Sequence, residues 1–332
     1  MSWQIAHGTA RLALLCLLIT VSSIAGPPRY GTSQTAPPSP YTLRVNVGMV
    51  VLHASVRQRN GTPWPKLRKE DFHVYEDGVG QQIETFSQDD IPVTAGLVVD
   101  SSGSMGPKRR EAVIAALTFA RLSNPRDQMF VVHFNENVSF GLPDNTPFTD
   151  RQADLRAALL RSDANGKTAL YDAVAAALEH LLKSSQDKKV LIVISDGADN
   201  ASKHNLAQIM SMAKQSDAII YTIGLFEPAD PDRNPGVLRQ LAKATGGEAF
   251  LPDSVQDIEP ICERIARDIR SQYTLGYLPM NQKQDGAYRA IEVKAAAPHR
   301  GRLSVRTRTG YYAPSPPQPP PSHGAGHDPP AH

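Results

Sequence analysis

The spacing of hydrophobic residues changes twice along the 332 residues of this chain. From residue 93 to residue 270, short apolar runs typical of buried strands alternate with segments of helical periodicity. The predicted strands are 95–100, 128–134, 189–195 and 218–224, with a polar edge strand at 138–142 and a short last strand within 246–251. The predicted helices lie near 107–122, 151–161, 169–183, 204–214, 235–245 and 255–270. This alternation predicts an α/β fold with a doubly wound, mostly parallel, Rossmann-like sheet.

The segments on either side of this region have β character instead. Before it, residues 45–57 alternate apolar and polar side chains, and 72–75 and 82–86 are predicted to pair as strands around the turn at 76–78. After it, the predicted strands are 273–277, 288–295 and 301–307. Each flank is too small to bury a core comfortably by itself. We therefore predict one smaller β-sandwich built from both flanks, 41–91 and 271–313, with the α/β domain 92–270 inserted between them.

The N-terminal segment has the pattern of an export signal. Arg11 precedes an apolar stretch at 12–21, and Ser23-Ile24-Ala25 forms a small-x-small cleavage site, which predicts a signal peptide over 1–25. The apolar stretch is shorter than the roughly 20 residues that a membrane-spanning helix needs. A lipoprotein reading of Cys16 is the alternative, although Leu15 before it is not small. We expect a periplasmic, extracellular or surface-associated protein with no integral membrane segment after cleavage.

Composition narrows the function classes further. The chain is 41% hydrophobic with a net charge of only +2, which predicts a folded core and gives no reason to expect a nucleic-acid partner. Of its two cysteines only Cys262 would remain after cleavage, on the apolar face of a predicted helix, so we predict a buried thiol and no internal disulfide. Residues 26–40 are predicted to be a Pro-rich linker and 314–332 a disordered tail rich in proline and histidine.

The candidate chemistry begins where the first α/β strand ends. Asp100, Ser102 and Ser104 occupy alternate positions of the loop that follows this strand. Ligands of open α/β sheets bind outside the carboxyl ends of the strands, so these oxygens are expected to converge on one point there. A carboxylate with two hydroxyls is a hard donor set that suits Mg²⁺ or Mn²⁺. Taken singly, each residue would be read as a helix cap or turn residue.

Two later residues complete a known pattern. Thr168 follows a Gly-led loop at the start of a predicted helix, and Asp196 ends a second buried strand. With Asp100-x-Ser102-x-Ser104, the chain resembles the von Willebrand factor type A (VWA) domain and its metal-ion-dependent adhesion site (MIDAS). The resemblance implies that Asp100, Ser102 and Ser104 hold the ion, that Thr168 joins when a partner is engaged, and that Asp196 acts directly or through water. It also implies a non-enzymatic protein whose ion binds an Asp or Glu carboxylate of a protein partner.

A narrower resemblance covers the flanks. The segments Tyr273-Thr274-Leu275-Gly276-Tyr277 and Arg308-Thr309-Gly310-Tyr311-Tyr312 are similar to segments in a secreted bacterial group of VWA-related proteins of the Acidobacterial type. With them, the resemblance extends over nearly all of residues 41–313.

Two other functions stay open at this stage. The chain could be a structural or assembly subunit of an envelope or export system, in which the metal only stabilises the fold. More remotely, Ser102-Gly103-Ser104-Met105-Gly106 resembles the nucleophile elbow of a serine hydrolase, with Asp196 and His204 as later partners, although the first glycine of that motif is missing. Asp172 and Asp199 are expected to be helix-start acids or supports of the metal loops, and His133 an interior histidine.

Overall fold

A computed structural model describes residues 48–58, 66–162, 164–227, 231–297 and 301–315, all of which fall in one compact unit, 46–332. The predicted signal peptide, the linker and nearly all of the tail lie outside the described residues. In the described part of the chain, no helix has the length and apolar character needed to cross a membrane.

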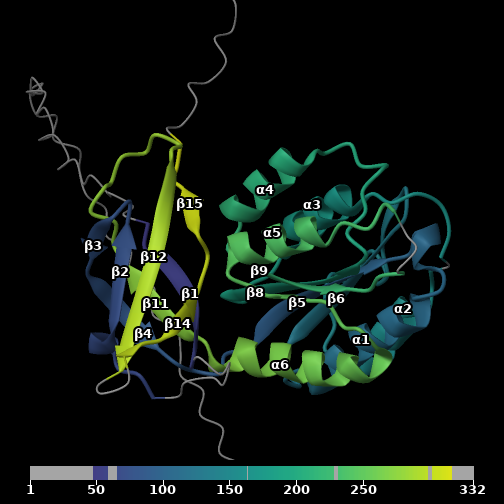
Figure 1. The fold of residues 1–332 in the computed structure, drawn as a ribbon, viewed down its shortest axis with the longest axis horizontal. Coiled ribbons are helices and arrows are strands. Elements are labelled where there is room, and N and C mark those ends of the chain that lie inside the picture. The colour runs from purple at the N-terminus through teal and green to yellow at the C-terminus, as the bar shows by residue number, and fades with distance from the viewer. Residues whose placement is uncertain (1–47, 59–65, 163, 228–230, 298–300, 316–332) are drawn as a thin grey trace, which may run out of the picture. The chain divides into compact units, whose positions relative to one another are not determined.

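The central element is a six-stranded sheet in the order β10-β9-β8-β5-β6-β7 (Figure 1). All neighbouring strands pair in parallel except the edge strand β7, which is antiparallel to β6. The strands are β5 Val93–Asp100, β6 Gln128–Phe134, β7 Val138–Phe140, β8 Lys188–Ser195, β9 Ile219–Gly224 and β10 Ala249–Phe250. Every residue of β5 is buried, as expected for a central strand covered on both faces. The predicted doubly wound sheet is therefore confirmed.

Helices cover both faces of this sheet. Figure 1 shows α3, α4 and α5 on one face and α1 and α6 on the other. The helices are α1 Arg109–Leu122, α2 Gln152–Leu159, α3 Leu170–Leu181, α4 Leu206–Gln215, α5 Pro235–Thr245 and α6 Ile258–Ser271, with 3₁₀ turns at Lys69–Asp71, Gly103–Met105 and Val255–Asp257. Cys262 on α6 is fully buried, as predicted.

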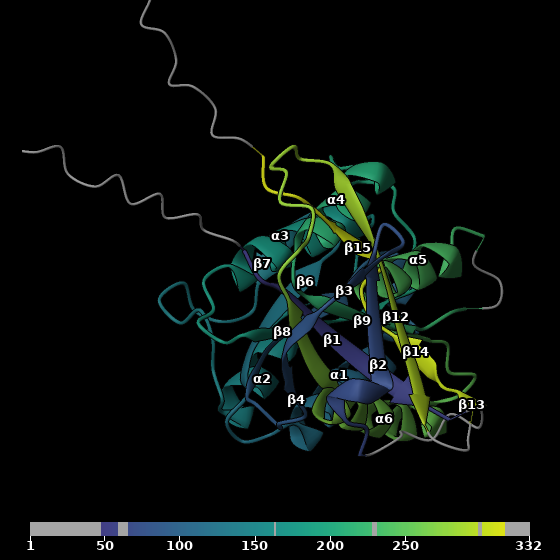
Figure 2. The same ribbon diagram turned by 90° about the vertical axis from the view of Figure 1, so that its left-hand side faces the viewer.

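The flanks form two further antiparallel sheets (Figure 2). One has the order β14-β1-β11-β4, with β14 Ser304–Arg306, β1 Val50–Arg57, β11 Tyr273–Tyr277 and β4 Ile83–Ser87. The other has the order β13-β12-β2-β3, with β13 Gly301–Arg302, β12 Tyr288–Ala297, β2 Phe72–Glu76, β3 Val79–Gln81, and β15 Gly310–Tyr312 paired to β12. Leu52 and Leu275 of the first sheet and Val74 and Val293 of the second belong to one buried cluster. Strands from both flanks thus share one core, as the sandwich prediction requires.

Two details of the sandwich differ from the sequence-based prediction. The predicted pairing of 72–75 with 82–86 is wrong, because β2 pairs with the short strand β3 while β4 pairs with β11 in the other sheet. Asp77 and Gly78 both have positive φ, which gives a two-residue hairpin that returns the chain directly onto Val79. The predicted single strand 301–307 is also divided, since β13 pairs with β12 and β14 pairs with β1.

Tyrosines of the two flank motifs meet a buried carboxylate. Glu76, which is 2% exposed, accepts hydrogen bonds from the hydroxyl groups of Tyr277 at 2.7 Å and Tyr311 at 3.0 Å. Tyr273 accepts from the backbone N–H of Leu67 at 3.0 Å. The bond from Tyr277 on β11 to Glu76 on β2 therefore joins the two sheets, whereas Tyr311 on β15 lies in the same sheet as Glu76.

Candidate functional site

The candidate site lies where the direction of winding changes. β6 lies on one side of β5, and β8 lies on the other. Asp100 is the last residue of β5, and Asp196 directly follows β8. In a doubly wound sheet the crevice at such a switch point is the usual place for a ligand. The fold therefore brings two carboxylates, 96 positions apart in the numbering, to neighbouring strand ends.

Four of the five predicted donors are joined by hydrogen bonds. The Ser104 hydroxyl donates to Asp196 Oδ2 at 2.7 Å and lies 3.1 Å from the Ser102 hydroxyl. The backbone N–H of Ser102 donates to Asp100 Oδ1 at 2.9 Å. Asp100, Ser102 and Asp196 are each no more than 2% exposed, whereas Ser104 is exposed. The set is thus buried at its base and open at Ser104.

Thr168 is placed beside this set by backbone contacts. It is 3% exposed, its N–H donates to Asn200 Oδ1 at 2.8 Å, and its carbonyl accepts from the N–H groups of Asn200 and Ala201. The N–H of Gly103 donates to the Gly166 carbonyl at 3.0 Å, which joins the Thr168 loop to the first loop. The Thr168 hydroxyl is not one of the hydrogen-bonded donors described above. The structure therefore connects the three loops and leaves this hydroxyl outside the connected set.

The surroundings of Asp100 disfavour the ionised form of its carboxyl group. Burial raises its pKa to about 7, and the negative charge of Asp196 acts in the same direction, while hydrogen bonds from Ser102 and Ser195 oppose the rise. The Ser195 hydroxyl donates to Asp100 Oδ2 at 2.6 Å. Sequence reasoning missed Ser195, although the parallel pairing of Val99 with Ile194 places the next residue of β8 beside Asp100.

Glycines with positive φ allow the loops to approach one another. Gly197 has a φ of 80°, and a Cβ atom there would lie 2.3 Å from the carbonyl oxygen of Asn234. Gly166 has a φ of 76°, and its Cβ would collide with the carboxylate of Glu136. Glu136 in turn accepts from the backbone N–H of Lys167 at 2.8 Å. At both glycines another segment of the chain comes so close that a side chain would collide with it.

Two acids whose roles were left open support the loops. Asp199 accepts from the backbone N–H of Tyr171 at 2.9 Å and from the Ser202 hydroxyl at 2.6 Å, so it caps the start of α3. Asp172 accepts from the N–H groups of Lys203 and His204 and from His204 Nδ1 at 2.6 Å. Both carboxylates tie the loop after β8 to the helix that follows Thr168.

The hydrolase alternative finds no support in these contacts. Within the described residues, Ser104 bonds to Ser102 and Asp196 and to no histidine, while His204 pairs with Asp172. His133 lies 2.9 Å from the Ala158 carbonyl through Nε2 and 3.5 Å from the Ser101 hydroxyl through Nδ1. It is therefore a satisfied interior histidine, as expected.

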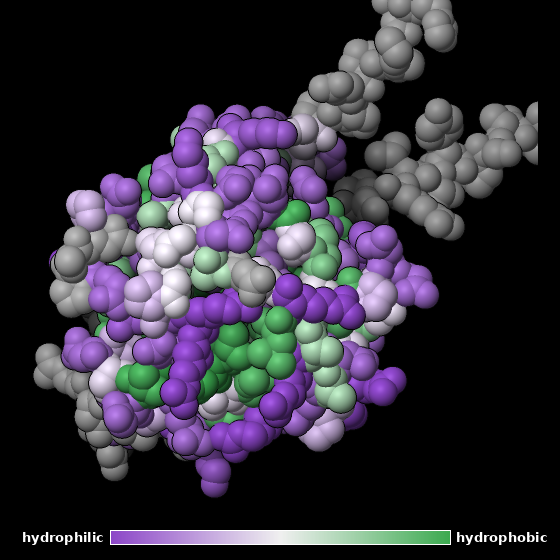
Figure 3. All heavy atoms as spheres, turned by 90° about the vertical axis from the view of Figure 1, so that its right-hand side faces the viewer, coloured by the Kyte–Doolittle hydropathy of each residue, from purple (hydrophilic) through white to green (hydrophobic). Residues whose placement is uncertain are grey.

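The donor chemistry fits a small divalent cation. The described residues contain no group of three or more His, Cys, Asp or Glu side chains that could hold a metal ion, so any ion at this site would depend on hydroxyl oxygens. Two carboxylates and the serine hydroxyls are hard oxygen donors of the kind that Mg²⁺ and Mn²⁺ prefer. A cation would also offset the desolvation of Asp100. Figure 3 looks onto the side opposite the flank sheets, where hydrophilic residues surround a recessed hydrophobic patch.

Together, the fold and the site define a doubly wound α/β domain with a polar crevice of carboxylate and hydroxyl groups at its switch point. Residues 96–264, just over half of the chain, match the von Willebrand factor type A domain. The chain therefore belongs to the VWA domain family. The match leaves both flanks outside it.

Several solved structures resemble this one. The conserved hypothetical protein BatB from Bacteroides thetaiotaomicron is 17% identical over 54% of this chain and 100% of its own, with a TM-score of 0.44. A von Willebrand factor type A protein from Catenulispora acidiphila is 13% identical over 81% of this chain and 73% of its own, with a TM-score of 0.47. The vWF domain of the type V pili tip protein Mfa5 from Porphyromonas gingivalis is 14% identical over 54% of this chain and 97% of its own, with a TM-score of 0.45. No curated protein matches the chain.

Proposed function

We propose that this protein is an exported, non-enzymatic binding protein that holds Mg²⁺ or Mn²⁺ in its VWA domain and uses the ion to bind an acidic group on a protein partner. The observation that carries the proposal is the contact of the Ser104 hydroxyl with Asp196 Oδ2 at 2.7 Å and with the Ser102 hydroxyl at 3.1 Å. It brings oxygens from two separate loops to one point. The segment Arg11 to Ala25 supports the exported location.

The charges at the site favour an acidic partner. Asp100, Ser102 and Ser104 would hold the ion, with Asp196 acting directly or through water and Thr168 joining on engagement. The bound ion would supply a centre of positive charge that attracts an anionic oxygen. The first loop contributes one carboxylate against the two charges of the ion, the hydroxyls contribute none, and Asp196 would add a second negative charge only where it coordinates directly. A partner carboxylate therefore gains a charge-assisted contact that water cannot equal.

The pattern of burial indicates where the partner approaches. Asp100 and Ser102 lie at the base of the crevice, each 1% exposed, while Gly103 and Ser104 are exposed. A partner would therefore reach the ion past Ser104. The same burial means that the base donors are held by the fold before the partner arrives.

The test compares Asp100→Ala with the matched control Ser101→Ala. Both residues are 1% exposed and adjacent, but the Ser101 hydroxyl faces His133 instead of the crevice. With Mg²⁺ at a hundred times its dissociation constant, the wild type should gain about 2.7 kcal/mol of stability by mass action. Asp100→Ala should lose this gain and Ser101→Ala should keep it, as measured by chemical unfolding with and without Mg²⁺. Equal loss in both variants would mean that the loop is needed for folding and does not act as a metal cradle.

Capture of a partner separates binding from assembly. The protein is immobilised and exposed to an envelope extract of its source organism, once with Mg²⁺ and once with EDTA. The proposal expects a protein that is retained only with Mg²⁺, is retained by Ser101→Ala, and is lost in Asp100→Ala. Stabilisation by Mg²⁺ without ion-dependent capture would favour the structural or assembly subunit instead.

A further inference from the structure

A second feature lies at the other end of the parallel strands, where the outer face of the β1–β11 sheet meets the α/β domain. The two surfaces are in direct contact near Ser55 and Arg57. The Ser55 hydroxyl accepts a hydrogen bond from Gln272 Nε2 at 3.2 Å, and Arg57 pairs with Asp268 at 2.9 Å. Toward the start of β1 the two surfaces separate. They enclose a cavity of about 550 Å³ there.

The walls of this cavity come from separate parts of the chain. Val51, His53 and Thr274 line it from the flank sheet, and 184–187 and 216–219 line it from the turns before β8 and β9. Arg308 lines it as well. Val51 is 44% exposed, so the cavity is accessible from outside. Its volume falls within the range of about 300–1,000 Å³ that is usual for small-molecule sites.

Arg308 forms no close ion pair in the described part of the chain, although the charge of Asp217 opposes the lowering of its pKa by burial. Its Nε donates to the Gly310 carbonyl at 3.1 Å and its Nη2 to the Lys214 carbonyl at 2.8 Å. Within the described residues, no carboxylate lies within 4.0 Å of its guanidinium, unlike the other cavity-lining cation, Lys189, which pairs with Asp217 at 2.9 Å. A guanidinium has five N–H donors, so two bonds to carbonyls fix its orientation and leave donors for a ligand.

Two cations, Lys189 and Arg308, and two acids, Asp187 and Asp217, line the cavity, and the buried cation Lys188 lies close enough to act on His53. Lys188, 4% exposed, donates to the Ile269 carbonyl and forms no ion pair in the described part of the chain. Burial, and after it the charge of Lys188, lowers the pKa of His53 to about 4; Arg308 adds to this effect and Asp217 opposes it. His53 is therefore neutral near pH 7, with Nδ1 placed 3.2 Å from the Thr274 hydroxyl. The acids that line the cavity are Asp187, which is exposed, and Asp217, which Lys189 neutralises.

We propose that this cavity binds a small organic anion whose carboxylate or sulfate oxygens are held by Arg308. An oxyanion would supply the directly bonded negative charge that this guanidinium lacks, in the planar two-bond arrangement for which arginine is suited. The site is separate from the metal crevice and needs no divalent ion. The proposal also assigns a role to Arg308, the first residue of the Arg308–Tyr312 motif. Another residue of this motif, Tyr311, donates its hydroxyl hydrogen bond to Glu76.

The test uses the full chain in EDTA, so that anions cannot bind through a metal. Saturation-transfer NMR is recorded with glucuronate, benzoate and phenyl sulfate, and with glucose and benzyl alcohol as neutral counterparts. The best anion is then titrated by calorimetry into the wild type, Arg308→Gln, Val51→Trp and the control Arg121→Gln. Arg121 is an exposed arginine paired with Glu259, far from the lining residues in sequence and absent from the cavity wall.

At least one anion should bind more tightly than its neutral counterpart. Arg308→Gln should weaken it about tenfold or more, the loss expected for a hydrogen bond between charged groups. Val51→Trp should reduce binding by filling the cavity from the flank sheet while keeping Arg308 itself, and Arg121→Gln should leave it unchanged. Absence of binding by every anion at millimolar concentration would overturn the proposal. Equal binding by Arg308→Gln or by Val51→Trp would do the same.

Discussion

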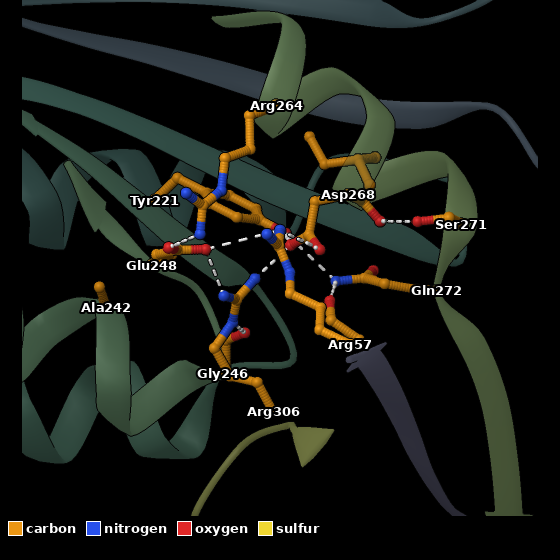
Figure 4. Close-up of polar contacts among 12 residues, drawn as sticks. Arg57, Tyr221, Ala242, Gly246, Glu248, Arg264, Asp268, Ser271, Gln272 and Arg306 are labelled. Atoms are coloured by element: carbon orange, nitrogen blue, oxygen red, sulfur yellow. Dashed lines mark hydrogen bonds and ion pairs between the residues drawn. The ribbon is translucent and has the colours of Figure 1, made fainter. Parts of the chain in front are cut away.

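Replacement of Asp268 by asparagine should strongly destabilise the protein, because this one carboxylate joins the flank sheet to the α/β domain. Asp268 lies on α6 and is 2% exposed. It accepts from Arg57 Nη2 on β1 at 2.9 Å, from Arg306 on β14, and from the Tyr221 hydroxyl on β9 at 2.6 Å (Figure 4). Arg306, Tyr221 and Arg57 together hold the pKa of Asp268 below its usual value in spite of burial.

The size of the effect follows from the charges that would remain. Asparagine keeps the shape of the side chain but removes its charge, which leaves Arg57 and Arg306 with Glu248 as their acidic partner. Glu248 is already shared with Arg264. Breaking a buried ion pair from one side costs about 3–5 kcal/mol. We therefore expect a loss of about 3 kcal/mol, which is readily measured because whole domains are stable by only about 5–15 kcal/mol.

The assay is urea unfolding followed by circular dichroism, with Glu259→Gln as the control. Glu259 also pairs with an arginine, Arg121 at 2.6 Å, but the two side chains are 61% and 56% exposed. Such a surface pair contributes at most about 1 kcal/mol. A double-mutant cycle with Arg57→Met should show coupling between Arg57 and Asp268. If Asp268→Asn costs no more than Glu259→Gln, the cluster does not join the two parts energetically.

Two further buried groups give measurable outcomes. Burial lowers the pKa of Lys188 from 10.5 to about 8. Between these two pH values the unfolded chain binds more protons than the folded one. The free energy of unfolding should therefore rise between pH 8 and pH 10 by up to about 3 kcal/mol. Lys188→Met should abolish the rise in a series of urea unfolding curves, and a rise that persists in the variant would contradict this assignment. Tyr277→Phe removes one of the two hydroxyls that donate to buried Glu76 and should cost about 1–3 kcal/mol, against little change for Tyr75→Phe on the other face of β2. Equal thermal stability of these two variants would refute the role of Glu76.

The α/β domain was predictable because its signals are local. The strand predicted at 95–100 is observed at Val93–Asp100, and the helix predicted at 255–270 is observed as a 3₁₀ turn followed by Ile258–Ser271. Fully apolar runs between turn residues and long helical periods leave few alternatives. The D-x-S-x-S loop was found for the same reason, since Asp100, Ser102 and Ser104 lie within five residues.

The rest could not be read from one sequence because it depends on distant pairings. Arg57 and Asp268 are 211 positions apart, and a charged residue in an alternating strand is naturally read as exposed. The crossing of β4 into the other sheet depends on its pairing with β11, about 190 residues later. Ser195 ends a strand next to Asp100, but a single serine at a strand end carries no motif, whereas its neighbour Asp196 does.

The position of Thr168 leads to a prediction that separates ion binding from partner binding. Its backbone is fixed by Asn200 and Ala201, while its hydroxyl lies outside the hydrogen-bonded donors Asp100, Ser102, Ser104 and Asp196. Thr168→Ala should therefore preserve the loop and weaken Mg²⁺ binding only slightly. If the hydroxyl joins the ion when a partner carboxylate is engaged, partner binding should weaken about tenfold, the worth of one hydrogen bond to a charged group.

Titration calorimetry measures the two steps separately, first with Mg²⁺ and then with a partner recovered by ion-dependent capture. Ser101→Ala, whose hydroxyl faces His133, should match the wild type in both titrations. A loss in Thr168→Ala that is equal for the ion and the partner would make Thr168 a permanent ligand of the ion. Partner binding that is unchanged in the variant and insensitive to chelation would show that recognition uses another surface, because no carboxylate could then be held through the ion.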